Sequence, residues 1–128
     1  MNLTLKQIEA ILALSGQRRY EHFIKVAADQ HRIWGLYNDG WALAGTVDEN
    51  PVFPVWPASE YATLCAVEDW AGYKPKEIDL HDFFEALLPS LQDRKTLLGV
   101  FFTPNNKGVT PSLEQVENDL REELARIE

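Results

Sequence analysis

Apolar residues recur at helical spacing near both ends of the chain. Thr4 and Gln7 have the spacing of a capping box, and apolar residues then return every three or four positions, first over residues 4–14 and again after Gln17. Residues 113–127 show the same spacing. The pattern predicts two helices before the middle of the chain and one after it.

The middle of the chain has shorter apolar stretches that are typical of strands. Ile33–Tyr37 and Trp41–Ala44 are separated by a turn with Asp39 and Gly40, a pair that supplies the positive φ angles of a tight hairpin. Val52–Trp56 follows a second turn. We therefore predict an N-terminal antiparallel meander of three strands that begins with a hairpin.

Pro54 and the later run Leu97–Phe102 indicate where two strands lie in the sheet. Pro54 has no backbone N–H, so we expect its strand at an edge, or that position turned outward. Leu97–Phe102 is almost continuously apolar, as in a strand covered on both faces, and we expect it in the middle of the sheet. Lys76–Ile78 is a further short strand.

Two more helices are expected between these strands. Ser59 is placed to cap a helix over residues 60–70, and Asp79 begins another helix. Pro89 should end or kink the second of these helices at Leu88, because proline cannot donate the helical hydrogen bond.

The resulting order is helix, helix, three strands, helix, strand, helix, strand, helix. It predicts a single α+β domain over residues 1–128, in which about five strands form a mixed or antiparallel sheet packed against helices. A length of 128 residues fits one domain.

The charge balance bears on the class of partner. The chain has 12 basic and 20 acidic residues, and residues 33–128 hold 7 of the basic and 17 of the acidic ones. Nucleic-acid affinity depends on Lys and Arg, so nucleic acid is not expected as a ligand and a basic protein partner is favoured. The alternative is that the charge only keeps a small protein in solution. Arg18, Arg19 and Lys25 are expected to be solvated.

The sequence also bears on location. No apolar run approaches the roughly 20 residues of a membrane-spanning helix, and the first ten residues lack the pattern of a secretion signal. Cys65 is the only cysteine, so no disulfide can form within the chain. We expect a cytoplasmic protein that does not enter a membrane.

Motifs for metal binding, cofactor binding or catalysis are absent from the sequence. His22, His31 and His81 do not have the spacing of a helical metal site, and there is no CxxC, HExxH, GxSxG or glycine-rich phosphate loop. Cys65 is expected as a small core residue rather than a reactive thiolate.

Two acidic pairs have the residue types of acid–base catalysts. Asp79 with Asp82, and Glu68 with Asp69, are each explained by a helix end or by solvation. We therefore assign no catalytic, cofactor-binding or metal-binding residue.

Aromatic residues are the most distinctive feature of the middle of the chain. Trp and Tyr anchor many binding surfaces, but they are also large core fillers with a polar group. Strand alternation cannot place all of them inside one face. The candidates for partner binding or for the core are Trp34, Trp41, Trp56, Tyr61, Trp70 and Tyr73.

The motifs Trp34-Gly35-Leu36, Val55-Trp56-Pro57 and Asp69-Trp70-Ala71-Gly72-Tyr73-Lys74-Pro75 resemble a known family. With Asp39-Gly40-Trp41-Ala42-Leu43 and Ile78-Asp79-Leu80, they are similar to small bacterial proteins grouped as domain of unknown function 2750. The similarity spans residues 20–102, with the terminal helices packing on that core. A more distant likeness is to SseB-like domains and toxin-immunity families. The resemblance implies a single α+β domain and brings no catalytic residues.

Two functions of different classes are compatible with these observations. The first is a non-catalytic protein-interaction module, immunity-like or regulatory, that uses an acidic, aromatic-rich surface. The alternative is a small enzyme at the corner formed by Trp56 and Pro57. A deep pocket there, lined by Glu60, Asp79 or a histidine with a shifted pKa, would favour the enzyme. The apolar stripes of the terminal helices pack on this chain's own sheet or on a second copy, so a homodimer is also open.

Overall fold

Two capped helices open the chain. The structure is a computed structural model and describes residues 3–47, 50–104 and 108–127. Helix α1, Leu5–Leu12, starts with the expected capping box, in which Thr4 Oγ1 accepts a hydrogen bond from Gln7 N and Gln7 Oε1 accepts one from Thr4 N. Helix α2, Gly16–Gln30, is capped by Ser15.

The strands form two small sheets. Strand β1, Arg32–Tyr37, pairs antiparallel with β4, Lys74–Asp79, over its whole length. Strand β3, Asn50–Val55, lies between β2, Ala44–Val47, and β5, Leu97–Val100. The β2–β3 pair is antiparallel and the β3–β5 pair is parallel.

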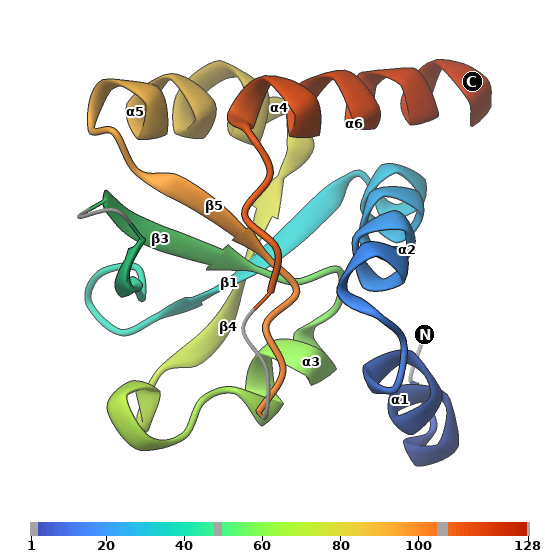
Figure 1. The fold of residues 1–128 in the computed structure, drawn as a ribbon, viewed down its shortest axis with the longest axis vertical. Helices are drawn as coiled ribbons and strands as arrows, with labels where there is room; N and C mark the ends of the chain where they lie inside the picture. Colours follow the sequence, from blue (N-terminus) through green and yellow to red (C-terminus); the bar gives the residue numbers. More distant parts are fainter. Residues whose placement is uncertain (1–2, 48–49, 105–107, 128) are drawn as a thin grey trace.

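A backbone bridge between Trp34 and Trp56 joins the two sheets. Trp34 N donates to Trp56 O at 2.9 Å, and Trp56 N donates to Trp34 O at 2.8 Å. The bridge brings β1 against the end of β3, so the strands cross in the middle of the molecule (Figure 1).

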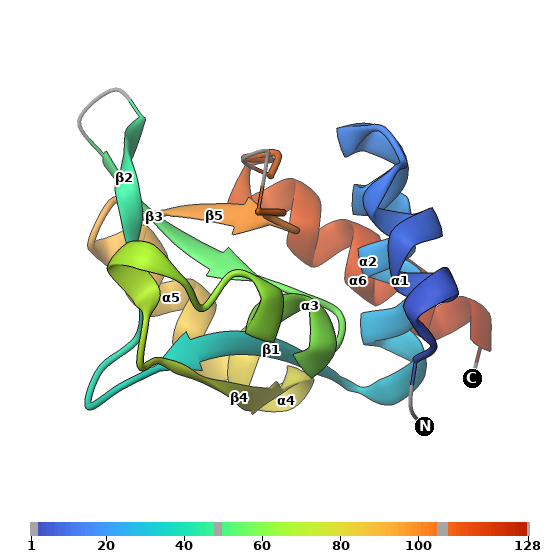
Figure 2. The same cartoon turned by 90° about the horizontal axis from the view of Figure 1, so that it is seen from below.

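Helical segments surround the strands. The shorter ones are α3, Ser59–Leu64, the 3₁₀ turn η1, Glu68–Trp70, and the consecutive segments α4, Leu80–Asp82, η2, Phe83–Leu87, and α5, Leu88–Asp93. The last helix, α6, Leu113–Ile127, is capped by Ser112 Oγ, which accepts from Gln115 N, and it packs against α2. Figure 2 shows α1, α2 and α6 gathered on one side of the strands.

The core lies between the strands and helices α2, α3 and α6. Its largest fully buried side chains include Phe23 of α2, Trp56, Tyr61 of α3 and Leu120 of α6. The expected α+β fold is confirmed, with its strands divided between the two sheets.

The predicted hairpin between Ile33–Tyr37 and Trp41–Ala44 was wrong. β1 takes β4 as its partner, and the expected pairing is reduced to one bridge between Tyr37 and Trp41 with a bond from Ala42 N to Leu36 O. Of the predicted meander, only the β2–β3 ladder is present.

The predicted positions of the Pro54 strand and the Leu97–Phe102 strand were also wrong. β3 is the central strand of its sheet and Pro54 is buried, whereas β5, among the described strands, pairs with β3 alone. Pro54 is tolerated because β2 starts at Ala44, opposite Val52. No residue of β2 therefore lies opposite Pro54 to require a hydrogen bond from its nitrogen.

Two helix predictions need correction. The helix expected over residues 60–70 ends at Leu64 and is followed by η1, and its N-cap is Ala58 rather than Ser59. The second helix does not end at Leu88: helical structure continues past Pro89 to Asp93, and η2, a wider π-helical turn, ends two positions before the proline. Asp79 caps α4 as expected, through a hydrogen bond from His81 N.

Candidate functional site

Two of the six candidate aromatics, Trp56 and Tyr61, belong to the core. Trp56 is 0% exposed, and its Nε1 donates to Phe102 O at 2.8 Å. Tyr61 is 2% exposed and its ring packs against Phe101 with centroids 4.8 Å apart. Neither side chain is accessible to a partner.

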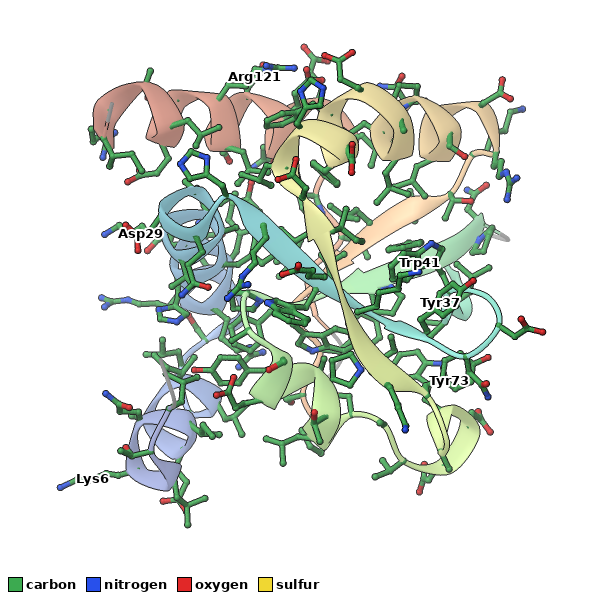
Figure 3. All side chains as sticks on the ribbon, turned by 180° about the vertical axis from the view of Figure 1, so that it is seen from behind. Lys6, Asp29, Tyr37, Trp41, Tyr73 and Arg121 are labelled. Atoms are coloured by element: carbon green, nitrogen blue, oxygen red, sulfur yellow. The ribbon has the colours of Figure 1, made fainter. Side chains whose placement is uncertain are left out.

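Trp41 lies at the open end of β1 together with Tyr37 and Tyr73 (Figure 3). The rings of Tyr37 and Trp41 meet edge to face at 5.1 Å, and Lys76 Nζ lies 4.1 Å from the Tyr37 ring centre. Tyr73 is partly buried. The Lys76 ammonium group lies over the faces of the Tyr37 and Trp41 rings. The position that a partner's cation would take on these rings is therefore already filled by the chain itself.

Trp41 also lines a hollow of about 640 Å³ between the strands and α5. The charged side chains in its wall are Asp82 and Arg94, one of each sign. The hollow therefore has no excess charge that would define a partner.

Trp34 and Trp70 lie apart from each other and from Trp41. Trp34 is half-buried beside α2, with the Arg32 guanidinium 5.1 Å from its ring centre. Trp70 is half-buried at η1, where its ring stands edge-on to Trp56 at 6.2 Å. The six aromatics therefore do not form one continuous surface.

Exposed aliphatic side chains gather around Trp70. Leu43 is 50% exposed and Val67 52%, and they are among the few large apolar residues exposed to this extent in the described part of the chain. Both line the same hollow as Trp70. Trp70 Nε1 donates to Leu43 O at 3.4 Å, which holds the 41–44 segment against η1. We call the group Leu43, Val67, Glu68, Asp69 and Trp70 the Trp70 surface.

The Trp70 surface contains a hollow of about 340 Å³. Leu43, Val67 and Trp70 form part of its wall, and Glu68 and Asp69 are exposed beside it. Neither carboxylate makes a salt bridge among the residues that the structure describes. The result is an apolar depression with free negative charge at its side.

Glu68 has an unusual backbone conformation. Its φ angle is +54°, in the left-handed region that non-glycine residues adopt at a cost of about 1–3 kcal/mol. This conformation turns the chain at the start of η1 and places Val67 and Glu68 on the outside. His31, Asp39, Lys95 and Phe101 have the same left-handed conformation, so it is not particular to the Trp70 surface.

Cys65 lies at the base of the same hollow and is buried. Its Sγ donates to Phe102 O at 3.4 Å, and burial raises the pKa of the thiol to about 11. The side chain is therefore a protonated thiol at neutral pH, which agrees with the expected core role.

A second site lies between α1 and the rest of the molecule, close to the Trp56–Pro57 corner. This groove has a volume of about 570 Å³, and we call it the α1 groove. Four segments contribute its walls: α1 with the preceding Leu3, α2, the start of β1, and residues 58–61. Its apolar lining includes Ile11, Val26 and Trp34.

The α1 groove contains charged groups of both signs. Asp29 of α2 and Glu60 of α3 are its carboxylates. Arg32 is engaged elsewhere, because its Nη1 lies 2.8 Å from Glu77 Oε2. Burial, and secondly the charge of Lys25, lower the pKa of His22 below its ordinary value of 6.5.

Contacts near both ends hold α1 over the groove. Leu3 N donates to Glu60 Oε2 at 3.3 Å. At the other end Arg19 Nη1 donates to the carbonyl oxygens of Leu12 and Leu14. Arg19 is thus buried at 5% exposure, contrary to the expectation that it would be solvated. In Figure 1, α1 lies beyond the end of α2, away from the strands.

Of the groups expected to mark a catalytic corner, the groove brings together Glu60 and a histidine with a shifted pKa, His22. Asp79 is not part of it, because it caps α4.

Within the described residues, no three His, Cys, Asp or Glu side chains are grouped as metal ligands. None of the described helices has the length and apolarity to span a membrane.

These features define a small α+β protein with an acidic apolar surface at Trp70 and a separate groove beneath α1. The chain belongs to the family described as "Protein of unknown function (DUF2750)", which matches residues 20–120. The match includes α2 and most of α6 but not α1. A comparison with curated proteins finds no match.

Proposed function

We propose that this protein is a cytoplasmic protein-interaction module, an immunity-like or regulatory binder, that holds a basic segment of a partner on the Trp70 surface. The observation that carries the proposal is that exposed Leu43 and Val67 line the same hollow as Trp70. Exposed apolar patches with polar borders are typical of interaction sites.

The partner's anchor is an apolar side chain that enters the hollow of about 340 Å³. Trp70 suits this role because its ring is supported from behind by Trp56 and Phe102, at 6.2 and 6.0 Å. A supported aromatic ring loses little conformational freedom on binding, as binding hot spots require.

The charge of the partner follows from Glu68 and Asp69. Both carboxylates are exposed beside the hollow, within a chain of net charge −8. Lys or Arg on the partner would pair with them, and the field of the whole chain would speed the encounter. The same field repels nucleic-acid phosphates.

The test is affinity capture from the source cell at low and at physiological salt, with identification by mass spectrometry. We expect a partner with a basic segment, captured more strongly at low salt because the exposed charges are then less screened. The variant Glu68→Gln/Asp69→Asn should reduce capture, and Val67→Ser should reduce it at both salt concentrations.

The matched control is Asp93→Asn/Glu122→Gln, which removes the same charges from exposed positions on α5 and α6. It should leave capture unchanged. Equal loss in the control and in the Glu68/Asp69 variant would show that only net charge matters. Capture unaffected by both the charge variant and Val67→Ser would overturn the proposal. Sedimentation of the purified chain separates a homodimer from a hetero-partner.

One observation favours the alternative, a small enzyme at the Trp56–Pro57 corner. His22, with its lowered pKa, and Glu60 both line the α1 groove, and perturbed histidines in clefts are characteristic of acid–base sites. A hydrolytic activity that is lost in His22→Gln and retained in Glu68→Gln/Asp69→Asn would support the enzyme. Such an activity would be independent of the Trp70 surface.

A further inference from the structure

We propose that the α1 groove binds a small hydrophobic amine, with an aromatic or branched aliphatic body and one ammonium group. Among the described residues, the groove and the hollow of the Trp70 surface share no lining residue, so this site is independent of the partner binding proposed above. Its volume of about 570 Å³ falls within the range of about 300–1,000 Å³ of small-molecule sites.

The body of the ligand is defined by the apolar walls. Ala10 and Ile11 come from α1, Val26 from α2 and Trp34 from β1. None of the α1 residues is buried in the structure, so a ligand placed between α1 and Trp34 would cover apolar surface that is now exposed to solvent. The gain is largest for a flat or branched apolar group of the size of an indole.

The ammonium group of the ligand is inferred from the carboxylates in the groove that have no cationic partner. Glu60 accepts bonds from Leu3 N and Ser59 Oγ, both uncharged, and its carboxylate can accept further donors. Asp29 has no salt bridge among the described residues and lies on a different wall.

The cations near the groove do not neutralise these carboxylates. Arg32 is bound to Glu77 and stacked over Trp34. Lys25 is near enough to lower the pKa of His22, but it does not line the groove, and His22 with its lowered pKa is neutral at pH 7. The uncompensated charge in the groove is therefore negative, which favours a cationic head group and disfavours a carboxylate.

Helix α1 would act as the cover of this site. It is held near its ends by the Leu3–Glu60 bond and by Arg19, while its middle faces the groove. A ligand in contact with Ile11 would add packing to a helix that has little of its own. Hydrogen exchange of residues 5–12 should slow when ligand is bound.

The experiment is a titration of the full chain with tryptamine, followed by the side-chain Nε1–H signal of Trp34 in ¹⁵N-labelled protein. Two compounds with the same ring serve as comparisons: 3-ethylindole lacks the charge, and indole-3-propionate carries a negative charge. We expect saturable binding of tryptamine, about tenfold weaker binding of 3-ethylindole, and still weaker binding of indole-3-propionate.

Variants locate the ammonium group. Glu60→Gln and Asp29→Asn should each weaken tryptamine binding by about tenfold and leave 3-ethylindole unchanged. Ala10→Trp places a large side chain in the groove from an exposed helical position and should abolish binding of both compounds. Glu122→Gln, at an exposed position on α6, is the control and should bind like the wild type.

Three results would overturn the proposal. The first is the absence of a saturable change at Trp34 with tryptamine. The second is equal or tighter binding of indole-3-propionate. The third is wild-type affinity in both carboxylate variants. Because the Trp70 surface is untouched in all these variants, partner capture would proceed normally whichever result is obtained.

Discussion

Trp41 and Trp56 are only 15 positions apart, yet the fold uses them differently. Trp56 is fully buried and its indole N–H is bonded to Phe102 O, whereas Trp41 is partly exposed and covers the edge of Tyr37. Both are large aromatic residues in a region of predicted strands, and their local sequence does not separate these roles.

Replacing the two tryptophans should therefore have unequal effects on stability. Trp56→Ala should lower the free energy of unfolding by about 3–5 kcal/mol, since it opens a cavity in the core. Trp41→Ala should cost about 1–2 kcal/mol, because less area is buried. Urea unfolding of both variants measures the difference, and equal losses would contradict the assignment of Trp56 to the core.

His22 should make stability depend on pH. Its pKa in the folded protein lies below the ordinary value of 6.5, chiefly because burial disfavours the charged ring. The unfolded chain then binds a proton near pH 6.5 while the folded chain does not, so stability falls as the pH drops below 6.5. Urea unfolding between pH 7.5 and 5 should show a steeper decline for the wild type than for His22→Gln. Parallel declines would mean that His22 is not shielded.

At the level of elements, helix starts could be predicted and strand partners could not. The caps Thr4, Ser112 and Asp79 each bond to a backbone N–H within three residues, so the short-range pattern contains the whole interaction. The pairing of β1 joins positions about 40 residues apart in the sequence. The Asp39-Gly40 turn indicated a reversal but not which strand would complete the ladder.

Pro89 shows a similar limit within a helix. Its missing N–H predicts that the helix ends or kinks at Leu88, but the π-helical turn Phe83–Leu87 changes the hydrogen-bond register just before it and helical structure continues to Asp93. Whether a helix ends at a proline or continues through it depends on packing around the turn, where Phe83 and Leu88 are buried.

Close packing of β5 on β3 predicts a strong effect at Gly99. A Cβ there would lie 2.6 Å from Val52 Cγ1 and 2.6 Å from Phe102 Cε1, so Gly99→Ala should cost about 1–3 kcal/mol. Gly45 in β2 has no atom within 4 Å of the same position, and Gly45→Ala should change stability by less than about 0.5 kcal/mol. Thermal unfolding of the pair tests the parallel β3–β5 arrangement, and a neutral Gly99→Ala would contradict it.

For the whole molecule, the two sites differ in how far the sequence could indicate them. Trp70, Glu68 and Asp69 are close in the sequence, and aromatic density with acidic charge was visible there, although Leu43 joins them only through the fold. The α1 groove combines His22 and Asp29 with Glu60, from helices on either side of β1. The sequence indicates Glu60 and an unspecified histidine for this corner but not Asp29, because a neighbour 30 or more positions away has no local signature.

The central claim is that the Trp70 surface holds a basic segment of a partner. The most direct measurement is the change in backbone amide chemical shifts of the ¹⁵N-labelled chain when the captured partner's basic segment is added. We predict the largest changes at Leu43 and residues 67–70, and their loss in Glu68→Gln/Asp69→Asn. Changes centred on β4 or α6 instead, or changes that persist in that variant, would contradict the account.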